Sequence, residues 1–293
     1  MWVFFALAAS MVNAIYYLIN QNIRLKPSIF MIYRGWIVAL MVIPFLFFYD
    51  TIAAWQFYAI AITQGCITAH NDYKSLKANR KYGAETVCSI IPINLSFIFL
   101  IWCFIEPMII IKYAQSPLKS AFILLSLCGI IYALTKYRKV KIAREAFVYL
   151  IPLMFLSAMI SIFNKTIMNY AQESLLGLCF WRIFITSLTV GIIHLFIYFR
   201  REKTLSQLVE KDNLCKCWIF IFMPLSMIFR NMAMYYTINP SYVAAIVQTS
   251  LLWIMFFNRY MPFIHCKKMC MQMDKKWAIL MLASVIILLI ATR

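Results

Sequence analysis

The residues that could do chemistry lie inside long apolar stretches of the chain. Uncharged polar side chains, aromatic residues and one arginine recur within these stretches, at Asn13, Tyr16, Gln64, Asn94, Asn164, Arg230, Tyr235, Gln248 and Trp253. In lipid, polar side chains are costly and generally face the interior of a helix bundle. We therefore expect these residues to line a cavity that binds a small solute. Hydrogen bonding between helices is the alternative role for each of them.

Carboxylates are informative because none lies in the middle of an apolar stretch. All ten Asp and Glu residues lie in loops or near the ends of stretches. A proton-driven antiporter commonly uses a buried carboxylate, so the sequence favours uniport or solute exchange. His70 and Asp72 are the one His–carboxylate pair that could relay protons, and a solvated helix end is the alternative for this pair.

Arginines offer a contact for an anionic solute. Arg34 and Arg182 each follow an aromatic residue early in a stretch, which favours an anchor at the membrane interface, with an anion contact at a cavity mouth as the alternative. Arg230 lies deeper, next to Asn231, and is the better candidate. Arg230→Ala is therefore predicted to abolish transport of an anionic solute and to spare a neutral one.

Signatures of enzymes and metal sites are missing. The chain has no His-Glu-x-x-His, Gly-x-Ser-x-Gly, Walker A or Gly-rich dinucleotide motif, so we expect no catalytic residues and no cofactor. Thiols at Cys215, Cys217, Cys266 and Cys270, with His265, could bind zinc. Their spacings differ from the usual Cys-x2-Cys, and reduced cytoplasmic thiols are the favoured interpretation. No metal is expected.

The elements that must position these residues are membrane-spanning helices. Hydrophobic residues make up 64% of the 293 residues and charged residues 13%, which excludes a soluble enzyme and a disordered protein. The apolar stretches do not alternate as barrel strands would. The sequence therefore predicts an all-α polytopic membrane protein with ten transmembrane helices, at 2–21, 28–49, 53–71, 85–105, 118–135, 146–164, 175–199, 216–236, 241–260 and 276–292.

The two halves of the chain resemble each other. Asn20-Gln21 is followed by Tyr33-Arg34, and Asn164-Lys165 is followed by Trp181-Arg182. We expect two inverted five-helix repeats, residues 1–140 and 141–293. Repeats of this kind place a substrate site near the membrane midplane between the halves.

The net charge of +18 is read as a signal of membrane orientation rather than of nucleic-acid binding. Twenty Lys and Arg residues fall in the five loops on one side of the predicted bundle, and four fall on the other side. Short basic loops stay in the cytoplasm. The charge pattern thus predicts that both termini lie outside the cytoplasm.

Three patches carry a resemblance to a known family. They are Met1-Trp2-Val3-Phe4-Phe5-Ala6-Leu7-Ala8-Ala9-Ser10, the junction from Ser157 to Arg182, and the junction from Asn231 to Ser250. In their order and spacing they resemble the drug/metabolite transporter superfamily, in its ten-helix EamA-like branch. The resemblance implies alternating-access carriers of small metabolites, amino acids or drugs. It also implies termini inside the cytoplasm, against the charge count.

The function expected from the sequence is a secondary transporter of a small metabolite or amino-acid-like solute. A flippase for a lipid-linked intermediate, and an integral membrane enzyme or scaffold, are the alternatives. We expect a monomer in the bacterial inner membrane, whose partners are its solute and the lipid.

Overall fold

A computed structural model of the chain describes residues 1–20, 25–82, 84–136, 144–170, 174–202, 208, 210, 216–260 and 275–292. Over these residues the protein is helical and has no strand. The helices are α1 (Trp2–Asn20), α2 (Pro27–Leu46), α3 (Trp55–Tyr82), α4 (Ala84–Ile105), α5 (Met108–Gln115), α6 (Pro117–Lys136), α7 (Arg144–Met168), α8 (Leu175–Glu202), η1 (Lys216–Ile221), α10 (Phe222–Tyr236), α11 (Pro240–Val247), α12 (Ser250–Tyr260) and α13 (Lys275–Ala291).

The helices are those of a multi-pass membrane protein. Within the described residues, seven helices or continuous helix pairs are long and apolar enough to cross a membrane: α1, α2, α6, α7, α8, η1 with α10, and α11 with α12. Part of α4 together with α5 makes an eighth if that bent pair counts as one span. The all-helical membrane class expected from the sequence is confirmed, whereas ten crossings stay a prediction.

Every stretch predicted to span the membrane coincides with a helix or a helix pair. Two of these helices, α3 and α13, are not among those that are long and apolar enough to cross a membrane. The helix α3 is rich in polar side chains and continues to Tyr82, well past residue 71, where we expected it to end. The helix α13 is apolar but has only 17 residues.

Prolines set several helix boundaries. Pro27, Pro117 and Pro240 are the first residues of α2, α6 and α11, where a missing N–H costs little. The predicted loop after α4 instead contains the short helix α5, and the two axes differ by 102° across Glu106-Pro107. Pro107 cannot donate the hydrogen bond that would continue α4, so the chain turns there.

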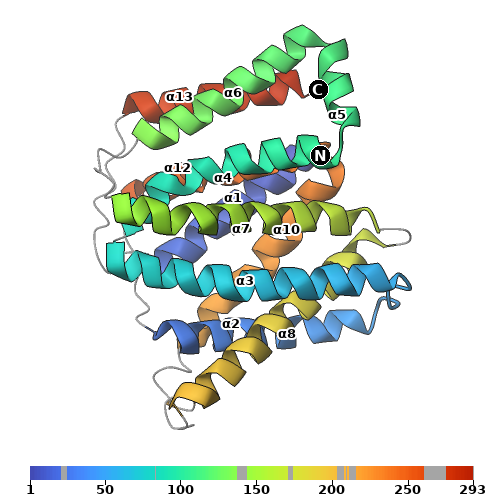
Figure 1. The fold of residues 1–293 in the computed structure, drawn as a ribbon, viewed down its shortest axis with the longest axis vertical. Coiled ribbons are helices and arrows are strands. Elements are labelled where there is room, and N and C mark those ends of the chain that lie inside the picture. The colour runs from blue at the N-terminus through green and yellow to red at the C-terminus, as the bar shows by residue number, and fades with distance from the viewer. Residues whose placement is uncertain are drawn as a thin grey trace.

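The two halves of the chain are interleaved in one bundle. Among the described helices, α2 packs along α8, α1 along α10, α6 along α13 and α4 along α7, while α3 lies against both α7 and α8 (Figure 1). The backbones of α2 and α8 approach closely, since a Cβ atom on Gly35 would lie 2.4 Å from the backbone nitrogen of Gly191. Small residues let these two helices approach backbone to backbone.

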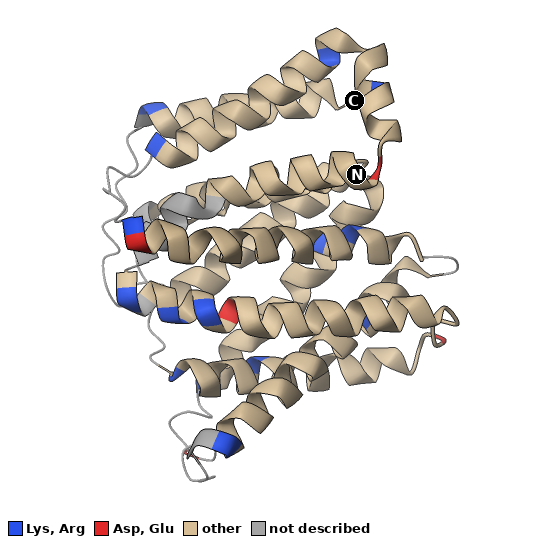
Figure 2. Cartoon of the chain, viewed as in Figure 1, with Lys and Arg blue, Asp and Glu red and all other residues tan. Residues whose placement is uncertain are grey.

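Charge is distributed unevenly over the bundle. The described Lys and Arg residues gather at the helix ends opposite the N- and C-termini, as Figure 2 shows. Lys74, Lys77 and Lys81 extend this basic end along the last turns of α3. Lys112 and Lys119 lie near the other end of the bundle, at α5 and the start of α6. The described basic residues therefore gather at the end of the bundle where the sequence predicts the basic loops.

Candidate functional site

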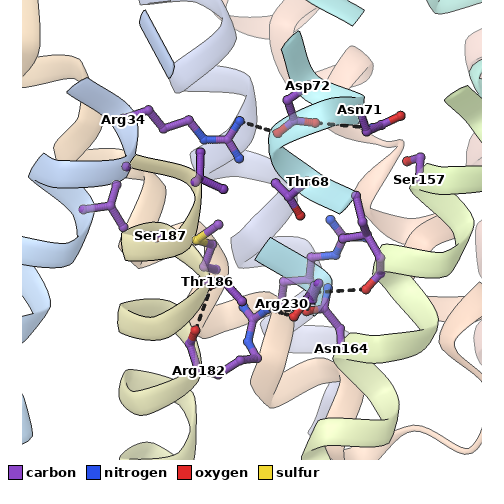
Figure 3. Close-up of a pocket in the computed structure, with 16 residues that line it drawn as sticks. Arg34, Thr68, Asn71, Asp72, Ser157, Asn164, Arg182, Thr186, Ser187 and Arg230 are labelled. Carbon is purple, nitrogen blue, oxygen red and sulfur yellow. Dashed lines mark hydrogen bonds and ion pairs between the residues drawn. The ribbon is translucent and has the colours of Figure 1, made fainter. Parts of the chain in front are cut away.

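A polar cavity of about 150 Å³ is enclosed by α2 and α3 from the first half and by α7, α8 and α10 from the second (Figure 3). Its walls combine charged, amide and hydroxyl side chains with a few apolar ones. The lining residues are Arg34, Gly35, Val38, Gln64, Thr68, Asn71, Asp72, Ser157, Ile160, Asn164, Arg182, Thr186, Ser187, Val190, Met227 and Arg230.

An ion pair lies at one end of the cavity. Arg34 on α2 donates a hydrogen bond to Asp72 on α3, and both side chains are mostly buried, with 15% and 26% of their surface exposed. Asp72 lies eight residues beyond Gln64 on the same helix, which is about 12 Å along the helix axis, and just before Lys74. The Arg34–Asp72 pair therefore lies between the amide-rich part of the cavity and the basic end of the bundle.

Arg182 on α8 is buried in an amide network at the other end. It donates to Asn164 Oδ1 and, at 3.2 Å, to Gln64 Oε1. Gln64 in turn donates to Asn164 Oδ1 at 2.6 Å and to the carbonyl of Ile160 at 3.1 Å. The three side chains come from α3, α7 and α8, so the network fixes the relative position of these helices. The buried Nε of Arg182 has no hydrogen-bond partner among the described residues.

Arg230 on α10 reaches into the same cavity. It donates to Ser161 Oγ at 2.8 Å, and its buried Nε has no hydrogen-bond partner in the described part of the chain. Within the described residues, neither Arg182 nor Arg230 has a carboxylate at ion-pair distance, since Asp72 pairs with Arg34. The positive charge of Arg230 acts unfavourably on that of Arg182. Among the described residues, the cavity thus holds two guanidinium groups that form no ion pair, and Asp72 acts favourably on Arg230 only from a distance.

Some of the residues proposed from the sequence meet at this cavity. Gln64, Asn164 and Arg230 line it, and so does Asp72. Asn94 is not among the lining residues but donates at 3.1 Å to Ser157, which is one of them.

The other proposed residues lie elsewhere in the bundle. Asn13 accepts a hydrogen bond from Ser226 at 2.6 Å, which joins α1 to α10, and Tyr16 is buried in an apolar cluster. Tyr235 is 39% exposed, Gln248 lies at the break between α11 and α12, and Trp253 stacks on Phe257. The cavity therefore does not include α1, α11 or α12, where some of the proposed residues lie, and it includes α2 and α8, where none of them lies.

The proposed proton relay lacks a direct contact. Asp72 is engaged by Arg34, while His70 is exposed on α3. Residues two apart on a helix do not face each other, so the two side chains point in different directions. The geometry supports His70 as a helix-surface residue.

Arg182 lines the cavity, although the sequence favoured an anchor at the membrane interface and gave an anion contact only as the alternative. An aromatic-Arg pair suggested an anchor at the interface, but Arg182 is only 3% exposed. The sequence feature that could have indicated a buried position is its distance from the helix start. Arg182 lies seven residues after Leu175, which is about 10 Å along α8. Arg34 lies at the same depth in α2, which begins at Pro27.

Lys165 is one of the four basic residues that the sequence count placed on the weakly basic side of the bundle. In the structure its side chain is buried. It donates to the carbonyls of Met234 at 2.9 Å and Tyr235 at 3.4 Å. These carbonyls belong to the last turn of α10, where intrahelical donors run out. Lys165 therefore caps the C-terminus of α10, and its charge does not count toward membrane orientation.

The described residues contain no group of three or more His, Cys, Asp or Glu side chains arranged to hold a metal ion. Cys215, His265, Cys266 and Cys270, the core of the zinc alternative, lie outside the described residues. In comparisons with known proteins, no family model matches the chain and no curated protein matches its sequence. The functional argument therefore rests on the cavity itself.

Proposed function

We propose that the protein is a secondary transporter that moves a small metabolite across the membrane by alternating access, through uniport or exchange. The observation that carries this proposal is the charged and amide-lined cavity inside a largely apolar helix bundle. Intramembrane polar groups of this kind typically mark solute pathways.

The helix packing supports two inverted repeats around this cavity. If α1, α2, α3, α4 and α6 correspond to α7, α8, α10, α11–α12 and α13, exchanging the halves exchanges several of the observed contacts, whereas the contact of α3 with α8 has only a weak counterpart in that of α10 with α2. The α1–α10 contact becomes α7–α3, and α4–α7 becomes α11–α12 with α1, while α2–α8 and α6–α13 map onto themselves. Each of these contacts occurs among the described helices, which supports a pseudo-two-fold relation between the halves.

The corresponding arginines support the same arrangement. Arg34 and Arg182 are equivalent in the sequence repeat, and both line the same cavity beside the α2–α8 contact. In inverted-repeat transporters the substrate site lies at the interface of the repeats. Rocking of one repeat against the other would expose the cavity to each side in turn.

Counterflow in proteoliposomes tests the proposal. The purified full chain is reconstituted, loaded with a pool of unlabelled metabolites, and screened for uptake of labelled amino acids, organic acids, phosphate and choline. Saturable, protein-dependent exchange of at least one solute is expected. Absence of exchange for every solute, combined with protein-dependent movement of a labelled lipid between leaflets, would contradict transport and favour the flippase alternative.

A further inference from the structure

The cavity has an unbalanced charge. Among its lining residues are Arg34, Arg182 and Arg230 but one carboxylate, Asp72, which Arg34 already engages. Buried cations without a partner are strongly disfavoured in a low-dielectric surrounding. Arg182 and Arg230 have only neutral acceptors in the described structure, namely amide and hydroxyl oxygens. A bound anion would supply the missing charge.

Arg182 and Arg230 also have N–H groups that could donate to a ligand. Arg182 and Arg230 each have a buried Nε–H that finds no partner in the part of the chain that the structure describes, and a guanidinium carries five N–H groups in a planar fork. That fork matches the two oxygens of a carboxylate or phosphate better than it matches a spherical ion. Ser187 on α8 adds a hydroxyl group to the same wall, whereas the hydroxyl of Thr186 donates to the carbonyl of Arg182 at 2.8 Å.

The volume limits the size of the occupant. The cavity has a volume of about 150 Å³. A single water molecule occupies about 10–15 Å³ of such a volume. The space therefore suits a solute of roughly ten non-hydrogen atoms. The Arg34–Asp72 pair is neutral overall and lines one end of the cavity.

We infer that the substrate of this cavity is a small oxyanion, a carboxylate or a phosphate compound, held between the guanidinium groups of Arg182 and Arg230. The identification as a substrate rests on the proposed transport function, whereas the anion site stands on the cavity alone. Bound oxyanion oxygens accept the free N–H groups of both arginines and neutralise their charge. Neutral and cationic solutes leave that charge uncompensated.

Binding to the detergent-purified full chain is tested first. Thermal unfolding is followed against inorganic phosphate, succinate, chloride and choline at constant ionic strength, since a ligand of the native state raises the midpoint with its concentration. Saturable stabilisation by phosphate or succinate is expected. Equal stabilisation by chloride, or by choline, overturns the inference, and the phosphate and succinate arms distinguish the two oxyanion classes.

Variants locate the site. Arg182→Gln and Arg230→Gln should each weaken oxyanion binding at least about tenfold, because each removes a charged donor. Arg200→Gln is the matched control, since Arg200 lies on α8 outside the cavity and stacks on Phe196. Unchanged affinity in both cavity variants overturns the inference.

Asn164→Asp keeps the test decisive if the glutamine variants fold poorly. This change places a carboxylate where Asn164 already accepts from Arg182, so it neutralises that arginine from within the protein. The variant should fold at least as stably as the parent and lose oxyanion binding. A well-folded Asn164→Asp protein that binds phosphate or succinate as before contradicts the inference.

Counterflow separates this inference from the transport proposal. Exchange of an oxyanion, lost in Arg182→Gln and Arg230→Gln and kept in Arg200→Gln, supports both. Exchange of only neutral or cationic solutes supports transport and overturns the oxyanion assignment. Saturable oxyanion binding without exchange of any solute supports the site and overturns transport.

Discussion

Arg34 and Arg182 occupy corresponding places in the two halves but have different partners. Arg34 pairs with a carboxylate, Asp72, whereas Arg182 has the neutral oxygens of Asn164 and Gln64. The charge of Arg34 is therefore balanced by Asp72, whereas Arg182 has no carboxylate at ion-pair distance among the described residues. This asymmetry suggests that Arg34 and Asp72 have a structural or gating role, while Arg182 contacts the solute.

A double-mutant cycle on the ion pair tests the structural role. Asp72→Asn leaves Arg34 without its counter-charge and should lower stability by about 2 kcal/mol, less than the ~3–5 kcal/mol of a fully buried pair because both groups keep some exposure. Arg34→Gln with Asp72→Asn should recover most of the loss, because the uncompensated charge is gone. Unfolding midpoints in detergent give the cycle, and additive losses would show that the pair is not coupled.

Lys165 offers a second residue-scale prediction. Lys165→Met removes the donor to the Met234 and Tyr235 carbonyls at the end of α10, and leaving a buried acceptor unpaired costs about 1–3 kcal/mol. We expect a lower unfolding midpoint by thermal denaturation. Lys119→Met, at an exposed position on α6, is the control. A midpoint as high as that of the control variant would show that the cap contributes nothing.

The cavity could be predicted from the sequence only in part. Gln64 and Asn164 stand out as polar residues deep in apolar stretches, and both line the cavity. Arg182 has the same type of local sequence as an interfacial anchor, and only its depth along α8 separates the two roles. Tyr235 and Trp253 could not be placed, because helix rotation decides whether an aromatic side chain faces a cavity, the core or lipid.

At the scale of elements, we predict that the close contact between α2 and α8 is sensitive to substitution of Gly35. Gly35→Val should separate α2 from α8, because even a Cβ atom would lie 2.4 Å from the backbone nitrogen of Gly191 and backbone cannot move cheaply. Overpacking of this kind costs about 1–3 kcal/mol. Solute exchange should fall as well, since Gly35 lines the cavity.

Leu40→Val on α2 is the control for that substitution, because Leu40 is 58% exposed. Its unfolding midpoint and exchange activity should match those of the parent protein. A Gly35→Val protein that is equally stable and active would show that α2 and α8 are not held in close contact.

Helix boundaries were predictable where local chemistry decides them. Proline fixes the starts of α2, α6 and α11. The end of α3 was not predictable from the sequence, because the charged residues of its last turns are typical of a loop. The length of α3 depends instead on its packing against α7 and α8. The helix α5 was also missed. Its Tyr113 lies 2.5 Å from the Tyr242 hydroxyl and accepts from Asn239 at 3.2 Å, contacts that no local pattern encodes.

At the scale of the whole molecule, the charge distribution bears on how the bundle lies in the membrane. The described Lys and Arg residues are concentrated at the end opposite both termini (Figure 2). Lys165 is removed from the weakly basic side because it is buried at the end of α10. The difference between the two sides is thus larger than the sequence count of twenty against four suggested.

Orientation gives the last prediction. Because short loops rich in Lys and Arg stay in the cytoplasm, we expect both termini to lie outside it, although the resemblance to EamA-like carriers implies the reverse. Insertion responds to the charge of this chain, so the charge pattern takes precedence. An alkaline phosphatase fused to the C-terminus should be strongly active, and a fluorescent protein fused there should stay dark. Fusions after Lys136, in the basic end, should give the opposite pair of signals. Bright fluorescence at the C-terminus with dark fusions after Lys136 would invert the bundle and place the Arg34–Asp72 end of the cavity outside.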